Sequence, residues 1–277
     1  MSNSSNVDLK AIRELYLSEL NFDLLDIKNQ KHSFYKNYEF LLKLNPNSEE
    51  FRFVLLHNLF GPIQYLEELK KISQKKYKVW KNRLIKNTDN VGIYGDLFEL
   101  YITWSLVMKK VEFKSIDSPD FEINYNNSKI FIECTSSQFE NGKTPTKVEI
   151  LSKLENTVSK KLMSKYANTS TALFVDITNL CYNSKLLNSN ITQDEIKLSV
   201  LNASNKIDGF ESSTTYGAFM FFWINISKDS KGRIIYVSNS FDIIENKNCD
   251  SKLLNFLKNN NVNIPDKKEV TTLKFSH

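Results

Sequence analysis

The stretch Asp117–Ser137, DSPDFEINYNNSKIFIECTSS, decides the fold that the rest of the chain is expected to take. Apolar and polar residues alternate with a period of two on both sides of Asn126 and Asn127. This period is typical of strands that bury one face, and asparagine tolerates the positive φ angles of a two-residue hairpin turn. The stretch therefore predicts two antiparallel strands joined by a tight turn.

The predicted register of this hairpin brings two acidic residues together. With the two asparagines as the turn, Tyr125 lies opposite Ser128 and, counting back, Asp120 lies opposite Glu133. Like charges that face each other across two strands destabilise a sheet, whereas a divalent cation bound by both carboxylates would compensate for the repulsion. Asp120 and Glu133 are therefore the first candidates for a functional site.

Length and composition favour a folded protein with a substantial core. The chain has 277 residues, of which 41% are hydrophobic and 25% are charged, which is enough for one large domain or for a domain with a helical extension. The longest strongly apolar run, Ala218–Ile224, is far shorter than the roughly 20 residues that span a bilayer. The first residues also lack a basic flank followed by an apolar core, so we expect a soluble cytoplasmic protein without a membrane segment.

The cysteines and histidines do not indicate a disulfide framework or a zinc site. The three cysteines lie far apart without CxxC spacing, and the three histidines form no HExxH pattern. An odd number of separated cysteines is typical of reduced thiols, and zinc sites usually carry closely spaced ligands. We therefore expect reduced cysteines and no structural zinc.

Residues 1–90 are expected to form an α-helical N-terminal region. Apolar residues recur there at helical spacings, with a break at Asn45-Pro46-Asn47-Ser48. Pro62 suits the first turn of a further helix, which we expect to be basic. No residue of this region is expected to be catalytic, and such a region would suit dimerisation or contact with DNA.

A lysine-rich stretch runs from Lys70 to Lys86. It contains eight basic residues and no acidic residue, whereas the net charge of the whole chain is only +5. One interpretation is a solvated helix face, because lysine is common on surfaces. The other is a helix that contacts DNA phosphates. Under the second interpretation the nucleic-acid-binding residues are Lys75, Lys76, Lys78, Trp80, Lys81 and Arg83.

The segment Val91–Lys110, VGIYGDLFELYITWSLVMKK, predicts a helix that is buried on most of its surface, because apolar residues occupy nearly all sides. Asp96 and Glu99 interrupt it on one face near its start. A buried carboxylate is costly without a cation or several donors. The alternative is that the helix dipole stabilises Asp96 and that Glu99 pairs with a lysine.

The remaining patterns predict a mixed α/β fold, that is, an α+β mixed sheet flanked by helices, over residues 91–277. A short strand is expected at Lys110–Ile116, so the order from Val91 is helix, three strands, helix and strand. The later elements are expected at Thr146–Tyr166 (helix), Thr171–Thr178 (strand), Ile191–Ile207 (helix), Tyr216–Ile226 and Arg233–Ser238 (strands), and Ser251–Asn259 (helix).

Three features follow one another along the chain: an acidic residue on a helix, Glu99, then the Pro119-Asp120 pair, then the strand segment Glu133-Cys134-Thr135. Together they resemble the PD-(D/E)xK nuclease superfamily, which has a restriction-endonuclease-like fold. The resemblance covers residues 92–179. The family usually carries a lysine two residues after the strand glutamate, and this chain has Thr135 there.

Some members of the family supply the missing lysine from the following helix. On the helix predicted at Thr146–Tyr166, Lys147 and Lys161 fall on one flank of the apolar stripe. Lys147 is therefore the first candidate and Lys161 the second, while Lys143 in the preceding loop is a third.

The resemblance implies a metal-dependent endonuclease, a phosphodiester hydrolase that acts on DNA, most often in restriction or another defence role. Asp120, Glu133 and the backbone carbonyl of Cys134 would hold Mg²⁺ or Mn²⁺, and Glu99 would bind a second ion directly or through water. The lysine would orient or deprotonate the attacking water and neutralise the phosphate. A homodimer with two-fold symmetry would suit cleavage of palindromic DNA.

Two other hypotheses remain open from the sequence. A catalytically degenerate member would bind nucleic acid or a protein partner without cleavage, and Thr135 supports this hypothesis. The hypothesis of a degenerate member is favoured if no lysine amine approaches the carboxylates of Asp120 and Glu133. A purely structural or interaction protein is favoured if these two carboxylates are not neighbours.

Overall fold

The computed structural model describes residues 9–46, 48–88, 92–137, 139, 145–180, 195–196, 198–199, 202–203, 215–228 and 234–259. The chain divides into two compact units, one built mainly on Met1–Val107 and the other mainly on Met108–Asn225. The division lies after Val107, whereas the sequence pattern predicts that the second part of the chain begins at residue 91.

The main part of the first unit is helical. Its core contains aromatic and aliphatic side chains from successive helices, among them the fully buried Tyr16, Phe34 and Leu59. The Tyr16 hydroxyl donates to the Leu59 carbonyl oxygen at 2.8 Å, so this buried hydroxyl group has a hydrogen-bond partner. The helices are α1 (Leu9–Leu15), η1 (Tyr16–Leu20), η2 (Ile27–Asn29), α2 (Ser33–Leu41), α3 (Glu49–Phe53), η3 (Val54–Phe60), α4 (Gly61–Ile72), α5 (Gln74–Lys86) and α6 (Gly92–Met108).

The lysine-rich stretch is not a single helix, which corrects the sequence prediction. Ser73 separates α4 from α5 and has an extended backbone, with φ −146° and ψ 92°. Its side chain accepts a hydrogen bond from the backbone N–H of Lys76 and so caps α5. A serine oxygen that satisfies a free N–H favours the start of a new helix over continuation of the old one.

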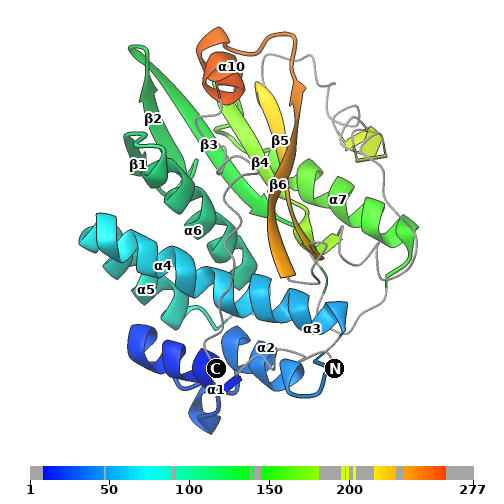
Figure 1. Ribbon diagram of the computed structural model, residues 1–277. Helices are drawn as coiled ribbons and strands as arrows, with labels where there is room; N and C mark the ends of the chain where they lie inside the picture. Colours follow the sequence, from blue (N-terminus) through cyan, green and yellow to red (C-terminus); the bar gives the residue numbers. More distant parts are fainter. Residues whose placement is uncertain are drawn as a thin grey trace. The chain divides into compact units, whose positions relative to one another are not determined.

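A six-stranded mixed sheet confirms the predicted α/β architecture (Figure 1). β1, β2 and β3 pair antiparallel, whereas β3, β4 and β5 pair parallel. The strands follow one another across the sheet in chain order. They are β1 (Phe113–Ser115), β2 (Phe121–Tyr125), β3 (Ser128–Ser136), β4 (Thr171–Asp176), β5 (Ala218–Lys228) and β6 (Ile234–Glu245).

The β2–β3 hairpin has the turn and the register that its sequence predicts. Asn126 and Asn127 have φ angles of 49° and 61°, and Tyr125 pairs with Ser128. The pairing continues to Phe121 opposite Ile132, so the next position along β3 from Ile132 is Glu133 and the next position back from Phe121 is Asp120. The predicted juxtaposition of these acidic residues therefore follows from the observed register.

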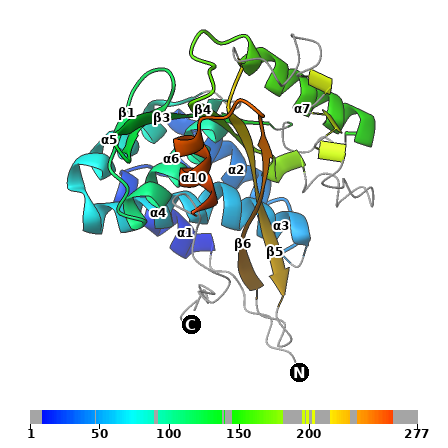
Figure 2. The same ribbon diagram turned by 90° about the horizontal axis from the view of Figure 1, so that it is seen from above.

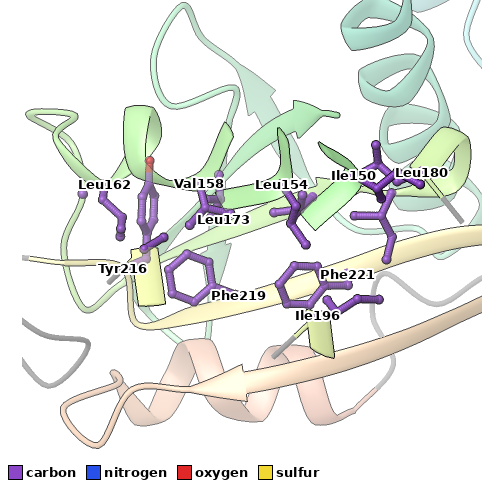
Figure 3. Close-up of a cluster of buried hydrophobic side chains, with 14 residues drawn as sticks. Ile150, Leu154, Val158, Leu162, Leu173, Leu180, Ile196, Tyr216, Phe219 and Phe221 are labelled. Carbon is purple, nitrogen blue, oxygen red and sulfur yellow. The ribbon is translucent and has the colours of Figure 1, made fainter. Parts of the chain in front are cut away.

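Helix α7 (Lys147–Leu162) connects β3 to β4 and covers one face of the sheet (Figures 1 and 2). A capping box starts the helix, because Thr146 accepts from the Glu149 N–H and the Glu149 carboxylate accepts from the Thr146 N–H. Figure 3 shows how its apolar stripe meets β4 and β5. The stripe consists of Ile150, Leu154, Val158 and Leu162, and the facing strand residues include Leu173, Phe219 and Phe221.

Helix α10 (Ser251–Lys258) agrees with the last predicted helix. Asp250 caps it by accepting from the Lys252 N–H at 2.7 Å, and Phe256 contacts the ring of Tyr125 near the hairpin turn. The helix predicted at Ile191–Ile207 lies largely outside the described residues. Across the described ranges, no helix is both long enough and apolar enough to span a membrane.

Candidate active site

Glu133 is a buried carboxylate in β3. It pairs in register with Leu173 of β4, and Leu173 belongs to the apolar cluster beneath α7. Residues paired in register share a face of the sheet, so the Glu133 side chain points to the face that α7 covers. Only 4% of this side chain is exposed, and a carboxylate at such a position requires compensating partners.

The two oxygens of Glu133 have different surroundings. Oε1 accepts hydrogen bonds from the Lys161 ammonium group and from the Tyr166 hydroxyl, the latter at 2.8 Å. Oε2 is buried and has no hydrogen-bond partner among the described residues. Buried polar atoms are seldom left unsatisfied. The unpartnered oxygen therefore marks a position where a ligand would complete the site.

Lys161 reaches Glu133 from the last turn of α7, where it is partly buried, with 30% of its side chain exposed. Burial acts to lower the pKa of its ammonium group, but the hydrogen bond and charge of Glu133 outweigh burial. Electrostatic interactions with Tyr166 and with Asp120 contribute in the same direction, and the pKa of Lys161 is raised overall. Lys161 is therefore a stable cation at neutral pH.

Asp120 lies immediately before β2 and contacts β3 beside Glu133. Its Oδ2 accepts a hydrogen bond from the backbone N–H of Cys134 at 2.6 Å, and its charge raises the pKa of Lys161. The structure thus brings together three of the predicted residues, Asp120, Glu133 and Lys161. The condition under which the sequence favours a purely structural or interaction protein, namely that Asp120 and Glu133 are not neighbours, is therefore not met.

The backbone carbonyl of Cys134 faces the same edge of β3 as Asp120. In antiparallel pairing a residue uses its N–H and its C=O toward the same neighbouring strand. Because the Cys134 N–H is directed to the Asp120 carboxylate, the Cys134 carbonyl oxygen lies on the Asp120 side of β3 as well. That the Cys134 carbonyl oxygen acts as the third oxygen donor stays a prediction.

Lys147, the first lysine candidate, is placed elsewhere. It lies in the first turn of α7, where its Nζ forms an ion pair with Glu195 at 2.6 Å. Lys147 and Lys161 are 14 residues apart on one helix, or about 21 Å along its axis. The lysine beside Glu133 is therefore Lys161, the second candidate. Lys143 lies outside the described residues.

Glu99 forms a bidentate ion pair with Arg83. The guanidinium donates from Nη1 to Oε2 at 2.6 Å and from Nη2 to Oε1 at 2.8 Å, and it also pairs with Asp96 at 2.5 Å. The sequence predicts a lysine as the partner of Glu99, and the structure shows Arg83 in that place. Glu99 belongs to the first compact unit, and its binding of a second metal ion stays a prediction.

Three of the predicted nucleic-acid-binding residues make structural contacts within the first unit. Trp80 is buried, and the Arg83 guanidinium lies over its ring, 4.7 Å from the centroid. Lys81 donates to the backbone carbonyl of Glu19 at 2.5 Å. Trp80 therefore does not present its ring to a base, and Arg83 and Lys81 are engaged by protein groups.

The other three predicted residues on α5 differ in exposure. Lys75 and Lys78 are exposed, whereas Lys76 is partly buried. Burial, and to a smaller extent the charge of Lys75, lower the pKa of Lys76. Lys75 and Lys78 are thus the residues of this set that remain available to a polyanion.

Sequence reasoning missed Tyr166, which it treated as the end of a helix. The residue follows α7 and donates to Glu133, which precedes it by 33 positions. Burial raises the pKa of its hydroxyl, and the hydrogen bond and charge of Glu133 add to this effect. No spacing in the sequence relates the two residues, because their contact depends on the crossover from β3 through α7.

The oxygen donors at this site suit a hard divalent cation. Among the described residues, no group of three or more His, Cys, Asp or Glu side chains could hold a metal ion. Mg²⁺, however, usually binds one or two carboxylates and completes its shell with water and substrate phosphates. Two carboxylates, Asp120 and Glu133, are present here, and the binding of an ion by them and by the Cys134 carbonyl stays a prediction.

Comparison of the chain with protein-family models, with curated proteins and with solved structures finds no match. The resemblance to PD-(D/E)xK nucleases therefore stays a prediction, and the geometry of the site itself carries the functional argument.

Proposed function

We propose that the protein is a Mg²⁺-dependent endonuclease that hydrolyses phosphodiester bonds of DNA. The observation that carries this proposal is the contact between Lys161 and Glu133. It provides a cation beside the acidic pair although Thr135 occupies the usual position of the lysine. The same contact also compensates the buried charge of Glu133, so the cleavage assay below decides between a catalytic and a purely structural role of Lys161.

The order of elements supports a restriction-endonuclease-like core. Helix α6 is followed by β1, β2 and β3, then by α7 and β4, which is the order that the resemblance implies. Asp120 lies immediately before β2, Glu133 lies within β3, and the lysine comes from the helix that follows. Each residue type therefore occurs on the element where the resemblance expects it.

Asp120, Glu133 and the Cys134 carbonyl would hold the ion. A bound Mg²⁺ lowers the pKa of water and stabilises negative charge that develops on the phosphate. The burial of Glu133 limits competition from solvent, because a partly desolvated carboxylate interacts more strongly with a cation than an exposed one does. Asp120 is oriented by the Cys134 N–H, which occupies its Oδ2.

Lys161 acts as a charged donor in this proposal. A general base must be unprotonated before it accepts a proton, and the raised pKa of Lys161 keeps its amine protonated. Of the two roles expected for the lysine, proton abstraction is therefore disfavoured. Lys161 would donate hydrogen bonds to the phosphate or to the attacking water and stabilise the charge of the transition state.

Cleavage of supercoiled plasmid DNA tests the proposal. The wild-type protein is incubated with Mg²⁺, with Mn²⁺ or with EDTA, beside the isosteric variants Asp120→Asn and Glu133→Gln. We expect metal-dependent cleavage by the wild type and a loss of at least about 100-fold in either variant. The matched control is Glu39→Gln, since Glu39 lies in α2 and forms an exposed ion pair with Lys43 at 3.5 Å.

Equal cleavage by wild type and Glu133→Gln would contradict the proposal. So would cleavage that persists in EDTA, because it would show that no divalent ion participates. DNA binding by the wild type without any cleavage would favour the second candidate function, a degenerate nuclease-fold protein. Thr135 is the specific residue that argues for that alternative.

A further inference from the structure

We infer that Tyr166 is a positioning residue of the proposed active site, which fixes the Glu133 carboxylate so that Oε2 is presented to the metal ion. This inference rests on the proposed function. Neither the hairpin pattern nor the family resemblance assigns a role to Tyr166, which lies between α7 and β4.

Both donors at Glu133 act on the same oxygen. The Lys161 ammonium group and the Tyr166 hydroxyl converge on Oε1, and Oε2 is left without a hydrogen-bond partner among the described residues. The final torsion of a glutamate is broad when nothing restrains it. Two donors that converge on one oxygen restrict this torsion and thereby define the direction of the other oxygen.

The backbone of Tyr166 is itself held in place. Its carbonyl oxygen accepts hydrogen bonds from Asn168 Nδ2 at 3.0 Å and from Thr171 Oγ1 at 3.1 Å. Thr171 is the first residue of β4, and the Tyr166 ring packs against the apolar cluster beneath α7. The hydroxyl group is therefore carried by a residue tied to the sheet.

The chemistry of a phenol suits this task. A phenol hydroxyl donates a hydrogen bond and carries no positive charge. Tyr166 can therefore orient Glu133 without adding a second positive charge beside Lys161. A second cation would weaken the attraction of the carboxylate for Mg²⁺, whereas a neutral donor affects it much less.

The test compares Tyr166→Phe with the matched control Tyr16→Phe. Tyr16 is a buried core tyrosine of the first compact unit, and its hydroxyl donates at 2.8 Å to a backbone carbonyl, that of Leu59. Both variants lose one hydrogen-bonded phenol hydroxyl, but only Tyr166→Phe removes a donor from a carboxylate. Mn²⁺ affinity is measured by electron paramagnetic resonance, and plasmid cleavage is measured against metal concentration.

We expect Tyr166→Phe to weaken Mn²⁺ binding and to raise the metal concentration for half-maximal cleavage by about 10- to 100-fold. The KM for DNA and the circular dichroism spectrum should change little. Tyr16→Phe should stay within about twofold of wild type in both metal measurements. A merely structural role of Tyr166 would not produce this separation of metal dependence from DNA dependence.

The outcomes distinguish this inference from the proposed function. If the wild type cleaves DNA and Tyr166→Phe keeps the wild-type metal dependence, the positioning role is overturned and the proposed function stands. If the wild type binds Mn²⁺ without cleavage and Tyr166→Phe weakens that binding, the positioning role is supported although the proposed function fails. If the wild type neither cleaves DNA nor binds Mn²⁺, both are overturned.

Discussion

Placing Glu133 on the α7 side of the sheet is unfavourable unless the carboxylate is compensated, because a buried charge loses its hydration. Lys161 and Tyr166 supply that compensation at Oε1 only. The ion pair is therefore expected to make a small net contribution relative to an apolar pair, but its disruption should be costly. Removing one partner leaves the other charge buried.

This asymmetry predicts the stability of three variants. Lys161→Met should lower the free energy of unfolding by about 3 kcal/mol, since it leaves the Glu133 carboxylate with Tyr166 alone. Combining it with Glu133→Gln should recover about 2 kcal/mol of that loss. Lys147→Met is the matched control. It removes the partly exposed ion pair with Glu195 and should cost at most about 1 kcal/mol. Urea denaturation measures all of these values.

The coupling between Lys161 and Glu133 also has an expected pH dependence. The pKa of Lys161 is raised in the folded protein, so its contribution is complete below the pKa of an unfolded lysine, about 10.4. It is lost only as the pH rises through the folded pKa. The coupling should therefore be constant between about pH 7 and pH 9, and a marked decline within that range would contradict the ion pair.

At the residue scale, the sequence predicts the acidic pair better than it predicts the lysine. Alternation and the asparagine turn are local, and together they determine the register that brings Asp120 to Glu133. The helical period places Lys147 and Lys161 on the same flank of α7. It does not determine which of the two lysines lies beside Glu133 of β3. That choice depends on how far α7 extends along the sheet, a tertiary property.

At the element scale, the crossover from β3 through α7 to β4 brings the residues of the candidate site together. The last part of this crossover, the turn before β4, makes a close backbone contact with the residue that precedes β5. The N–H of Gly217, just before β5, donates to the carbonyls of Asn168 and Thr171 at 3.1 and 2.9 Å. A Cβ atom at Gly217 would lie 2.0 Å from the carbonyl oxygen of Thr169. The turn that precedes β4 thus approaches β5 too closely for any side chain.

Two glycine substitutions should therefore change stability in opposite directions. Gly217→Ala should lower the free energy of unfolding by about 3 kcal/mol, because the backbone of Thr169 has to shift. Gly95→Ala is the matched control. A Cβ atom at Gly95 meets no atom within 4 Å, and alanine in the interior of α6 is favoured over glycine by up to about 1 kcal/mol. Urea denaturation that shows equal losses in both variants would contradict the close approach at Thr169.

The limits of sequence reasoning are also visible at this scale. The strands around the hairpin and the helix at residues 147–162 follow from their own periodicity, whereas the separation of α4 from α5 at Ser73 does not. Lysine-rich and apolar positions continue across Ser73, so the helical pattern shows no interruption there. The break arises because the Ser73 side chain accepts the hydrogen bond of the Lys76 N–H. In a continuous helix, that N–H would instead donate to a backbone carbonyl of the preceding turn.

At the scale of the whole molecule, charge is distributed unevenly while its sum is small. The net charge is +5, but no acidic residue occurs between Lys70 and Lys86. The structure divides these basic residues into two classes. Arg83 and Lys81 are bound by protein groups, whereas Lys75 and Lys78 extend into solvent. A surface that binds DNA through phosphates would therefore use the second class.

The final prediction concerns this division. The double variant Lys75→Gln/Lys78→Gln should weaken binding of a short DNA duplex and reduce the slope of log K against log salt concentration by about 2, close to one for each lysine removed from a phosphate. Fluorescence anisotropy over a range of NaCl concentrations measures both quantities. The matched control is Lys10→Gln/Lys43→Gln, which removes the same charge from lysines that form exposed ion pairs with Glu14 and Glu39.

A general attraction of DNA to the net positive charge would affect both double variants equally. Local binding through α5 would affect only Lys75→Gln/Lys78→Gln, because only that variant removes ammonium groups that neutralise phosphates and release counterions. Identical salt slopes for the two variants would therefore exclude α5 as a DNA-binding element. In that case the solvated-face interpretation of the lysine-rich stretch would hold, and DNA binding would have to come from residues outside α5.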